Sequence, residues 1–443
     1  MAGFAPADGA AFRANLAVTL ARLTSSLAGV VSGRIWVAYS GGLDSHALLH
    51  ALAVQGVEQL HAVHIDHGLH AASSAWDEHC RARCAELAVP YVSRAVDATA
   101  RAGQSPEDSA RRARYAAIAD LLSDGDILLT AQHRDDQLET FLLQMLRGAG
   151  PKGLAAMPEV ARMGAGWLLR PFLEVDRETI HAYASGQGLV WLDDPSNSDT
   201  RFDRNYLRHA VIPALRNRWP AVARTVARSA RLAARAASAI ERQARADLEE
   251  MAPADAGTLP IAPLQRMGDV RAREVLRLWL LNAGVPVQAE ALIERVLTEL
   301  MVARVDAEPV IPVGEGTLRR HRGHIHLVPQ LPEISDWSLS WADPSQALVL
   351  PAGLGRLVWD DPPQVSPLRV HARRGGERYR EIGGSRPTRA MKDVLREAGL
   401  PPWLRPLLPL VSELHGPVIG VPGVSPGLIW EAPDGLLTHR SMT

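Results

Sequence analysis

The chain has 443 residues, a length that predicts about three domains at roughly 150 residues each. Apolar residues make up 47% of it and charged residues 22%, which is typical of a globular protein and excludes disorder as the main state. The formal charge is −1, so a site for nucleic acid has to be a local basic patch. Only Lys152 and Lys392 among the 48 basic residues are lysines. Codon bias and a use of guanidinium groups in phosphate binding would both produce this excess of arginine.

The cysteine content and the N-terminal sequence predict a cytoplasmic location. Two cysteines cannot form a disulfide framework, and the first residues show no basic segment followed by an apolar run. No uninterrupted apolar stretch reaches about 18 residues, so we expect no membrane span. Cys80 and Cys84 have no second cysteine pair to complete a zinc site with four ligands. We therefore expect both to pack within a helix, and we assign no metal cluster.

The first 150 residues alternate between helical and strand patterns. A first helix is indicated by apolar residues at intervals of three and four, namely Phe12, Leu16, Leu20, Leu23 and Leu27. Strands are predicted over 35–39, 60–65, 91–96 and 126–130, and helices over 46–54, 74–88, 108–122 and 135–147. This alternation predicts an α/β fold with a doubly wound parallel sheet, which binds ligands beyond the carboxyl ends of its strands.

Two changes of composition indicate further domains. Residues from 216 to about 300 are rich in Ala and Arg and look all-helical, whereas residues from about 332 are rich in Pro, Gly and short apolar runs. We predict a nucleotide-binding catalytic domain over 1–215, a helical domain over 216–331 and a small mixed α+β domain over 332–443.

The first strand runs directly into Ser40-Gly41-Gly42-Leu43-Asp44-Ser45, and a helix follows. The glycines allow close approach of a ligand, and the serines and the helix N-terminus supply O–H and N–H donors. This pattern predicts a phosphate-binding loop rather than a simple capped turn. The lysine with which a P-loop reaches the β- and γ-phosphates is absent, and Asp44 occupies the charged position. A carboxylate beside phosphates suits Mg²⁺, and the missing lysine favours cleavage between the α- and β-phosphates.

The hexapeptide resembles the PP-loop of the N-type ATP pyrophosphatases, which would be of the Rossmann-like class. Other segments follow in order at 65–69, 110–115, 130–140, 146–150, 170–173 and 204–208. Together they resemble the tRNA(Ile)-lysidine synthetase family over roughly residues 33–213, and segments 374–378 and 392–409 resemble its final domain. That family usually has histidine where this chain has Gln132, and arginine where it has His70.

The resemblance implies a carbon–nitrogen ligase that uses ATP and Mg²⁺. It implies that the C2 carbonyl oxygen of the wobble cytidine in the CAU anticodon of tRNA(Ile) is adenylated and that the ε-amine of L-lysine then displaces AMP. The product, lysidine, would change the codon and amino-acid identity of the tRNA from methionine to isoleucine. The first domain would take the anticodon loop and the other two the rest of the tRNA. The sequence leaves both a monomer and a homodimer open.

Five side chains are candidates for the chemistry, together with Asp44. Asp136 and Glu139 share one face of a helix, where they are able to hold the lysine ammonium group or Mg²⁺. We expect Arg112 and Arg204 to neutralise the α-phosphate or a carboxylate as pyrophosphate leaves. His133 is a candidate general base or phosphate ligand, and helix capping is the alternative.

A basic segment over 201–245 contains eleven arginines and only two acidic residues. We expect Arg208 to bind substrate, and the helical spacing of Arg224, Arg228, Arg231 and Arg235 predicts a stripe that contacts tRNA phosphates. An ordinary Arg-rich surface helix is the alternative. A second basic patch over 369–405 contains two glycine pairs, Gly375–Gly376 and Gly383–Gly384, whose amides we expect to approach phosphates.

Two competing functions remain at this level. A PP-loop tRNA thiolase would be expected to use reactive or cluster-binding cysteines. Cys80 and Cys84 are predicted on a helix away from the loops at the strand ends, which disfavours this function. The second competing function is that of a non-catalytic RNA-binding protein that kept the ATP-binding fold.

Overall fold

The computed structural model forms two compact units, Met1–Ala239 and Ile240–Thr443. The structure describes residues 9–27, 33–66, 73–96, 106–194, 198–251, 253, 257–285, 290–304, 307–333, 336–351, 353–364, 367–382 and 387–432.

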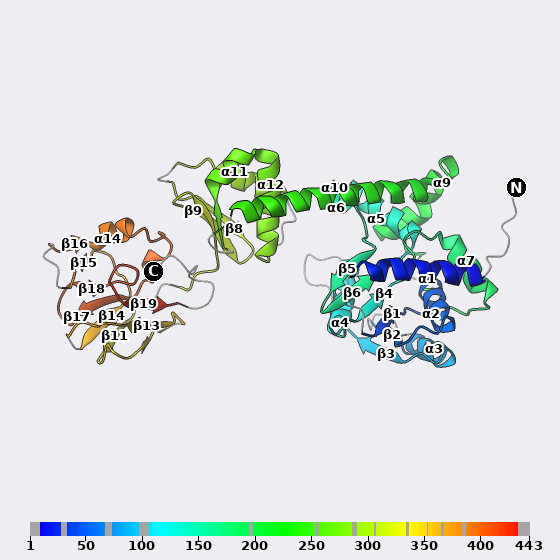
Figure 1. The fold of residues 1–443 in the computed structure, drawn as a ribbon, viewed down its shortest axis with the longest axis horizontal. Helices are drawn as coiled ribbons and strands as arrows, with labels where there is room; N and C mark the ends of the chain where they lie inside the picture. Colours follow the sequence, from blue (N-terminus) through cyan, green and yellow to red (C-terminus); the bar gives the residue numbers. More distant parts are fainter. Residues whose placement is uncertain are drawn as a thin grey trace. The chain divides into compact units, whose positions relative to one another are not determined.

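The first unit carries the alternating helices and strands (Figure 1). In chain order its elements are α1 (Gly9–Ser25), β1 (Ile35–Ala38), α2 (Leu43–Val54), β2 (Leu60–Asp66), α3 (Ser73–Glu86), β3 (Tyr91–Ala95), α4 (Pro106–Ala119), β4 (Ile127–Leu129), α5 (Arg134–Leu146), α6 (Pro151–Leu154), β5 (Val160–Met163), β6 (Gly166–Leu169), α7 (Arg177–Gly186), α8 (Asp203–Tyr206), the π-helix η2 (Leu207–Val211), α9 (Ile212–Arg218) and the start of α10 (Val222–Met251). The helices and strands predicted before residue 147 are confirmed, with small differences at their ends.

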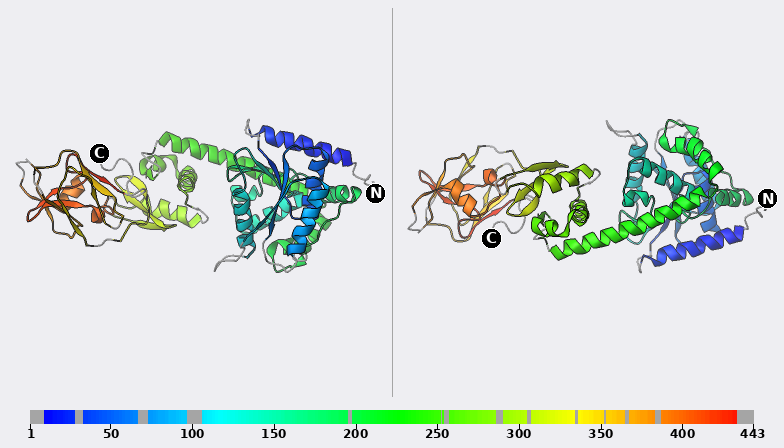
Figure 2. Two further views of the ribbon diagram at one scale, coloured as in Figure 1. Left: turned by 90° about the horizontal axis from the view of Figure 1, so that it is seen from below. Right: turned by 90° about the horizontal axis from the view of Figure 1, so that it is seen from above.

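The six strands form one sheet in the order β3-β2-β1-β4-β6-β5. Neighbours are parallel except β5, which runs antiparallel to β6. Successive strand residues point to opposite faces, so Val37 joins the core formed with α1, α2, α3 and α7, while Trp36 joins the core formed with α4. Figure 2 shows helices on both sides of this sheet. The predicted doubly wound α/β fold is confirmed.

Two smaller predictions in this unit are also confirmed. Phe12, Leu16 and Leu23 form the buried face of α1. Cys80 and Cys84 are fully buried in α3 and belong to the same core, as expected for packing residues.

The second unit is a mixture of helices and short strands. Its elements after α10 are β7 (Thr258–Pro260), α11 (Ile261–Met267), α12 (Asp269–Asn282), α13 (Glu290–Arg295), the π-helix η3 (Val296–Leu300), β8 (Val310–Val313), β9 (Gly316–His321), β10 (His324–Val328), β11 (Ser338–Trp341), β12 (Leu348–Val349), β13 (Arg356–Trp359), β14 (Leu368–His371), β15 (Arg378–Tyr379), β16 (Arg389–Ala390), α14 (Met391–Glu397), the 3₁₀-helix η4 (Arg405–Leu407), β17 (Leu410–Glu413), β18 (Val418–Gly420) and β19 (Leu428–Glu431).

The expected helical region contains a sheet that the sequence analysis missed. Strands β7, β10, β9 and β8 pair in that order, so residues 216–300 are not all-helical. The strands bury one face through Ile311, Leu318 and Ile325, which pack on helices α11–α13. Each strand has only three to six residues, too few for a clear alternating pattern. The final region is the expected mixture of strands and helix.

Candidate active site

The loops after β1 and β4 meet at one edge of the sheet. These strands are parallel neighbours, with Trp36 opposite Leu128, although β2 and β3 lie between them in the sequence. In a doubly wound sheet, ligands bind at such a change in strand order, outside the carboxyl ends. The hexapeptide after β1 and the segment after β4 therefore form the candidate site.

The loop after β1 is a tight turn that leads into α2. Gly41 has a φ of 78°, and a Cβ atom there would lie 2.9 Å from Cys80 Sγ. The hydroxyl oxygens of Ser40 and Ser45 are 3.0 Å apart, and Ser45 Oγ accepts a 3.2 Å hydrogen bond from the Ser40 N–H. Gly42 caps α2 without a side-chain hydrogen bond, which leaves the N–H groups of the first turn able to bind phosphate.

Asp44 lies in that first turn with one carboxylate oxygen unused. Its Oδ1 atom is buried and has no hydrogen-bond partner among the described residues. Burial raises the pKa of Asp44, and the neighbouring His133 opposes this shift. A desolvated carboxylate oxygen beside a phosphate loop fits a hard cation such as Mg²⁺, because the cation would replace the lost solvation.

His133 caps α5 and faces two carboxylates. Its Nδ1 atom accepts a 3.2 Å hydrogen bond from the Asp135 N–H, and the Asp136 side chain accepts one of 3.0 Å from the His133 N–H. In the neutral imidazole the proton is then on Nε2. This atom lies 3.5 Å from Asp136 Oδ2 and 3.7 Å from Asp44 Oδ2. Capping is confirmed, and a catalytic role remains a prediction.

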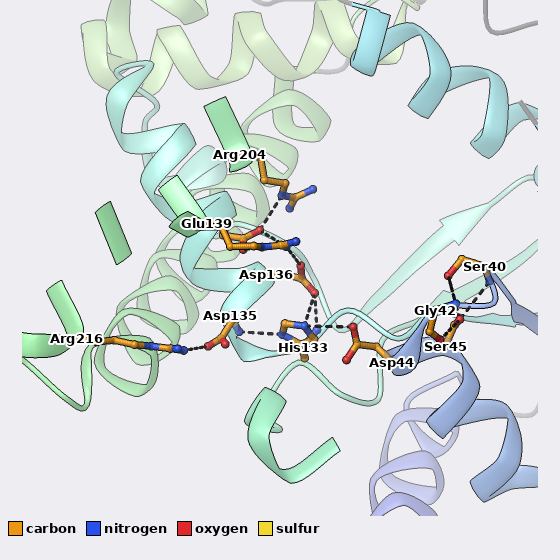
Figure 3. A network of polar contacts seen from close by, with 11 residues as sticks. Ser40, Gly42, Asp44, Ser45, His133, Asp135, Asp136, Glu139, Arg204 and Arg216 are labelled. Atoms are coloured by element: carbon orange, nitrogen blue, oxygen red, sulfur yellow. Dashed lines mark hydrogen bonds and ion pairs between the residues drawn. The ribbon is translucent and has the colours of Figure 1, made fainter. Parts of the chain in front are cut away.

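Glu139 is almost completely buried, and two guanidinium groups surround it (Figure 3). Its Oε1 atom accepts a 2.6 Å hydrogen bond from Arg208 Nε, and Oε2 accepts bonds of 3.0 Å from Arg204 Nε and Arg208 Nη2. Asp136 has a longer contact, 3.4 Å from Arg208 Nη2 to Oδ1. Asp136 and Glu139 therefore share a face, as expected, but Glu139 is already neutralised and Asp136 is the more accessible carboxylate.

The two arginines come from adjoining helical segments. Arg204 belongs to α8, where its Nη2 also donates to Thr140 Oγ1 at 3.0 Å, and Arg208 belongs to the π-helix η2. Single π-turns occur frequently at functional sites. The expectation that Arg204 neutralises a carboxylate fits its contact with Glu139. Arg112 is exposed on α4, and its role stays a prediction.

The sequence analysis missed an ion pair at the start of α5. Asp135 Oδ1 lies 2.5 Å from Nη2 of Arg216, which belongs to α9. The only signal was the doublet Asp135-Asp136, because 81 residues separate the two partners.

The predicted arginine stripe lies on the solvent-exposed side of α10. Arg224, Arg228, Arg231 and Arg235 are exposed, whereas Ala223, Ala227 and Ala230 are buried on the neighbouring face. Arg231 forms an ion pair with Glu174, and both side chains are about half exposed. The shared face is confirmed, and contact with RNA stays a prediction.

The second basic patch differs from expectation. Glu377 Oε1 accepts hydrogen bonds of 2.5 Å and 2.7 Å from the N–H groups of Arg374 and Gly375. The prediction that the Gly375 amide is free for a phosphate is therefore wrong in this structure, because a carboxylate of the same turn occupies it. The pair Gly383–Gly384, residues 67–69 of the family segment 65–69, and His70 lie outside the described residues.

In the part of the chain that the structure describes, no group of three or more His, Cys, Asp or Glu side chains is arranged to hold a metal ion. No described helix is long and apolar enough to cross a membrane. Burial raises the pKa of both Cys80 and Cys84 to about 12, so neither thiol is activated.

Comparisons with known proteins agree with this geometry. Family models match at residues 14–215 (PP-loop domain), 259–326 (TilS substrate binding domain) and 368–434 (TilS substrate C-terminal domain). A tRNA(Ile)-lysidine synthase from Methylococcus capsulatus is 39% identical over 415 residues, which cover 90% of this chain and 94% of the relative. One from Pseudomonas syringae pv. tomato is 39% identical over 439 residues, 94% of this chain and 96% of the relative.

A solved U34-tRNA thiolase from Methanococcus maripaludis aligns with a TM-score of 0.41 and 14% identity, covering 50% of this chain and 78% of that one. A structural similarity this weak does not indicate a function for this chain.

The parallel sheet, its glycine-rich loop and the matching domain model define a PP-loop ATP-binding enzyme. Within that class, the 39% sequence identity to two tRNA(Ile)-lysidine synthases over nearly the whole chain distinguishes one family. The chain belongs to the tRNA(Ile)-lysidine synthase family.

Proposed function

We propose that this protein ligates L-lysine to C2 of the wobble cytidine in the CAU anticodon of tRNA(Ile). The C2 carbonyl oxygen attacks the α-phosphorus of ATP, and pyrophosphate leaves. The ε-ammonium group of lysine then gives up a proton, the resulting amine attacks C2, and AMP leaves with the former carbonyl oxygen. The observation that carries the proposal is the meeting of the phosphate loop with the His133–Asp136 turn at one edge of the sheet.

The loop from Ser40 to Ser45 would bind the ATP phosphates through the first-turn amides of α2 and the two hydroxyl groups. Asp44 would hold Mg²⁺, which would neutralise phosphate charge as pyrophosphate leaves. The buried Oδ1 atom without a partner supports this assignment.

Lysine would place its ammonium group beside Asp136 rather than Glu139. Both oxygens of Glu139 already accept hydrogen bonds from arginines, whereas Asp136 faces the site with longer contacts. Glu139 would instead fix the orientation of Arg204 and Arg208. We propose that Arg112 and Arg204 stabilise charge on the α-phosphate through charge-assisted hydrogen bonds.

The tRNA would lie along the arginine stripe of α10. Its guanidinium groups are exposed on one face of a helix of 30 residues, where they would neutralise the negative charges of a phosphate backbone. The paired arginines of the second basic patch make that patch a weaker candidate. A cytoplasmic location and a homodimer remain predictions.

A tRNA thiolase is the alternative within the class. The two buried thiols, with pKa values raised to about 12, argue against it. Replacement of both Cys80 and Cys84 by Ala should leave ligation intact in any preparation that folds.

The first step is tested with α-phosphate-labelled ATP and unmodified tRNA(Ile) in the absence of lysine. Label should appear on the RNA, and adding lysine should release it as AMP. A tRNA that differs only by uridine at the wobble position is the control. Pyrophosphate release with neither RNA labelling nor lysine dependence would reject the proposed order of steps.

A further inference from the structure

The first turn of α5 is held from three sides. The consecutive residues Arg134, Asp135 and Asp136 contact the segment before α7, helix α9 and the π-helix η2, respectively. Only Asp136 of these three also contacts His133 through its side chain. The direction in which this turn presents His133 therefore depends on contacts outside the reacting groups.

The ion pair between Asp135 and Arg216 links the first turn of α5 to α9. The Asp135 side chain is 12% exposed and that of Arg216 36% exposed, and their closest atoms are 2.5 Å apart. Arg216 Nη1 also lies 3.7 Å from Glu178 of α7. Loss of the arginine would leave a largely buried carboxylate without its cation, a costly arrangement. The first turn of α5 would then have to move to rehydrate Asp135.

Movement of that turn would act directly on His133. The Asp135 N–H is the group that fixes His133 Nδ1 as an acceptor and so leaves the proton on Nε2. Nε2 is the atom that faces Asp44 and Asp136. One residue thus holds α9 through its side chain and sets the histidine tautomer through its backbone.

We propose that Asp135 and Arg216 form a positioning pair that keeps the Nε2–H of His133 directed at Asp44 and Asp136 during the adenylation step. The proposal rests on the proposed function for the identity of that step. Neither residue is assigned a contact with ATP, lysine or RNA.

The kinetic test uses the full-length chain with the variants Asp135→Asn, Arg216→Gln and the double variant. Arg22→Gln is a matched control, because Arg22 forms a two-bond ion pair with Glu159 (2.9 Å and 2.6 Å) that links α1 to the segment entering β5. When a mutation displaces an active-site group by about 1 Å, the rate of the catalysed step can fall about 100-fold. We therefore expect kcat for pyrophosphate release to fall about 10- to 100-fold in both single variants. We expect the Kd for tRNA to change less than threefold and the control to match wild type.

The double variant should be no slower than the slower single variant, because the two residues act as one unit. A loss confined to the Kd for tRNA would make Arg216 a phosphate contact and overturn the proposal. So would a kcat within twofold of wild type, or additive losses in the double variant.

A spectroscopic readout keeps the inference separate from the proposed function. With ¹⁵N-labelled histidine, and with the His133 signals assigned by their loss in His133→Gln, wild type should show Nε2 protonated and Nδ1 unprotonated. Arg216→Gln should shift both signals toward mixed tautomers, while Arg22→Gln should not. Unchanged signals in a folded Arg216→Gln protein would overturn the positioning role even if the enzyme ligates lysine. Shifted signals without any tRNA-dependent turnover in wild type would reject only the proposed function.

Discussion

The Nε2 atom of His133 lies 3.7 Å from Oδ2 of Asp44 and so connects the turn after β4 to the phosphate loop after β1. This separation is longer than a hydrogen bond, for which about 2.7–3.2 Å is usual. Catalytic contacts in ligand-free enzymes are frequently long and shorten when substrate binds. The two residues thus lie next to each other at the edge of the sheet where the phosphate loop begins α2.

Replacement of His133 separates capping from catalysis. Asn is a favourable N-cap residue, so His133→Asn should keep the free energy of unfolding within about 1 kcal/mol of wild type. Without the imidazole between Asp44 and Asp136, kcat should fall at least 100-fold, in the range of lost acid–base or positioning groups. Chemical denaturation and pyrophosphate release measure the two effects. A stable variant with normal kcat would reduce His133 to a helix cap.

The raised pKa of Asp44 predicts a pH dependence of cation binding. Burial keeps the proton on this carboxyl group to a higher pH than usual, and a cation must displace that proton. Binding should therefore weaken as the pH falls, beginning above the ordinary aspartate pKa of about 3.9. Mn²⁺ serves as the probe and is followed by electron paramagnetic resonance with and without ATP. Asp44→Asn should bind weakly at every pH; retention of the wild-type profile would remove Asp44 from the metal site.

Asp136 and Glu139 should respond differently to loss of charge. Asp136→Asn should raise the KM for lysine at least 10-fold with less change in the KM for ATP, because it removes the proposed ammonium partner. Glu139→Gln should lower the free energy of unfolding by about 3 kcal/mol, because it leaves Arg204 and Arg208 without their buried anion. Steady-state kinetics and denaturant titration distinguish them. A lysine-specific defect in a fully stable Glu139→Gln enzyme would return the ammonium site to Glu139.

The arginine stripe predicts a change in salt dependence. Replacing Arg224, Arg228 and Arg235 by Ala should weaken tRNA binding and flatten the plot of log K against log salt by about 2, at about 0.7 per lost phosphate contact. Arg22→Gln, on α1, is the control. The slope is obtained from binding titrations at several salt concentrations, and an unchanged slope would show that these arginines do not contact phosphate.

Arg231 provides an internal comparison. Its pair with Glu174 is exposed, and such pairs contribute about 1 kcal/mol or less. Glu174→Gln should therefore tighten tRNA binding by up to about fivefold at low salt. Weaker binding in this variant would indicate that Glu174 orients Arg231 for the RNA.

The catalytic half of the fold was predictable because its signals are local. Each strand and helix has its own apolar pattern, and the hexapeptide from Ser40 to Ser45 identifies the strand end that binds phosphate. The parallel neighbours β1 and β4 then bring His133 and Asp136 to the same edge. The sheet formed by β7–β10 was not predictable because its strands are short and β7 is distant in sequence from its partner.

Pairing of charges was the main feature that the sequence did not reveal. The spacing of Asp136 and Glu139 indicated a shared face but could not show that Arg208 reaches both. The glycine pair at Gly375 indicated exposed amides, whereas Glu377 folds back onto them. Such contacts depend on tertiary structure or on a single turn, and a count of charges along the sequence does not contain them.

The most direct test of the proposed ligation is transfer of labelled L-lysine to unmodified tRNA(Ile) in the presence of ATP and Mg²⁺. The wobble nucleoside is isolated after digestion and its mass is measured. We predict one lysine per tRNA, joined to the wobble cytidine, in wild type but not in Asp44→Asn. An unmodified cytidine after incubation with folded, ATP-binding and tRNA-binding protein would contradict the proposed function.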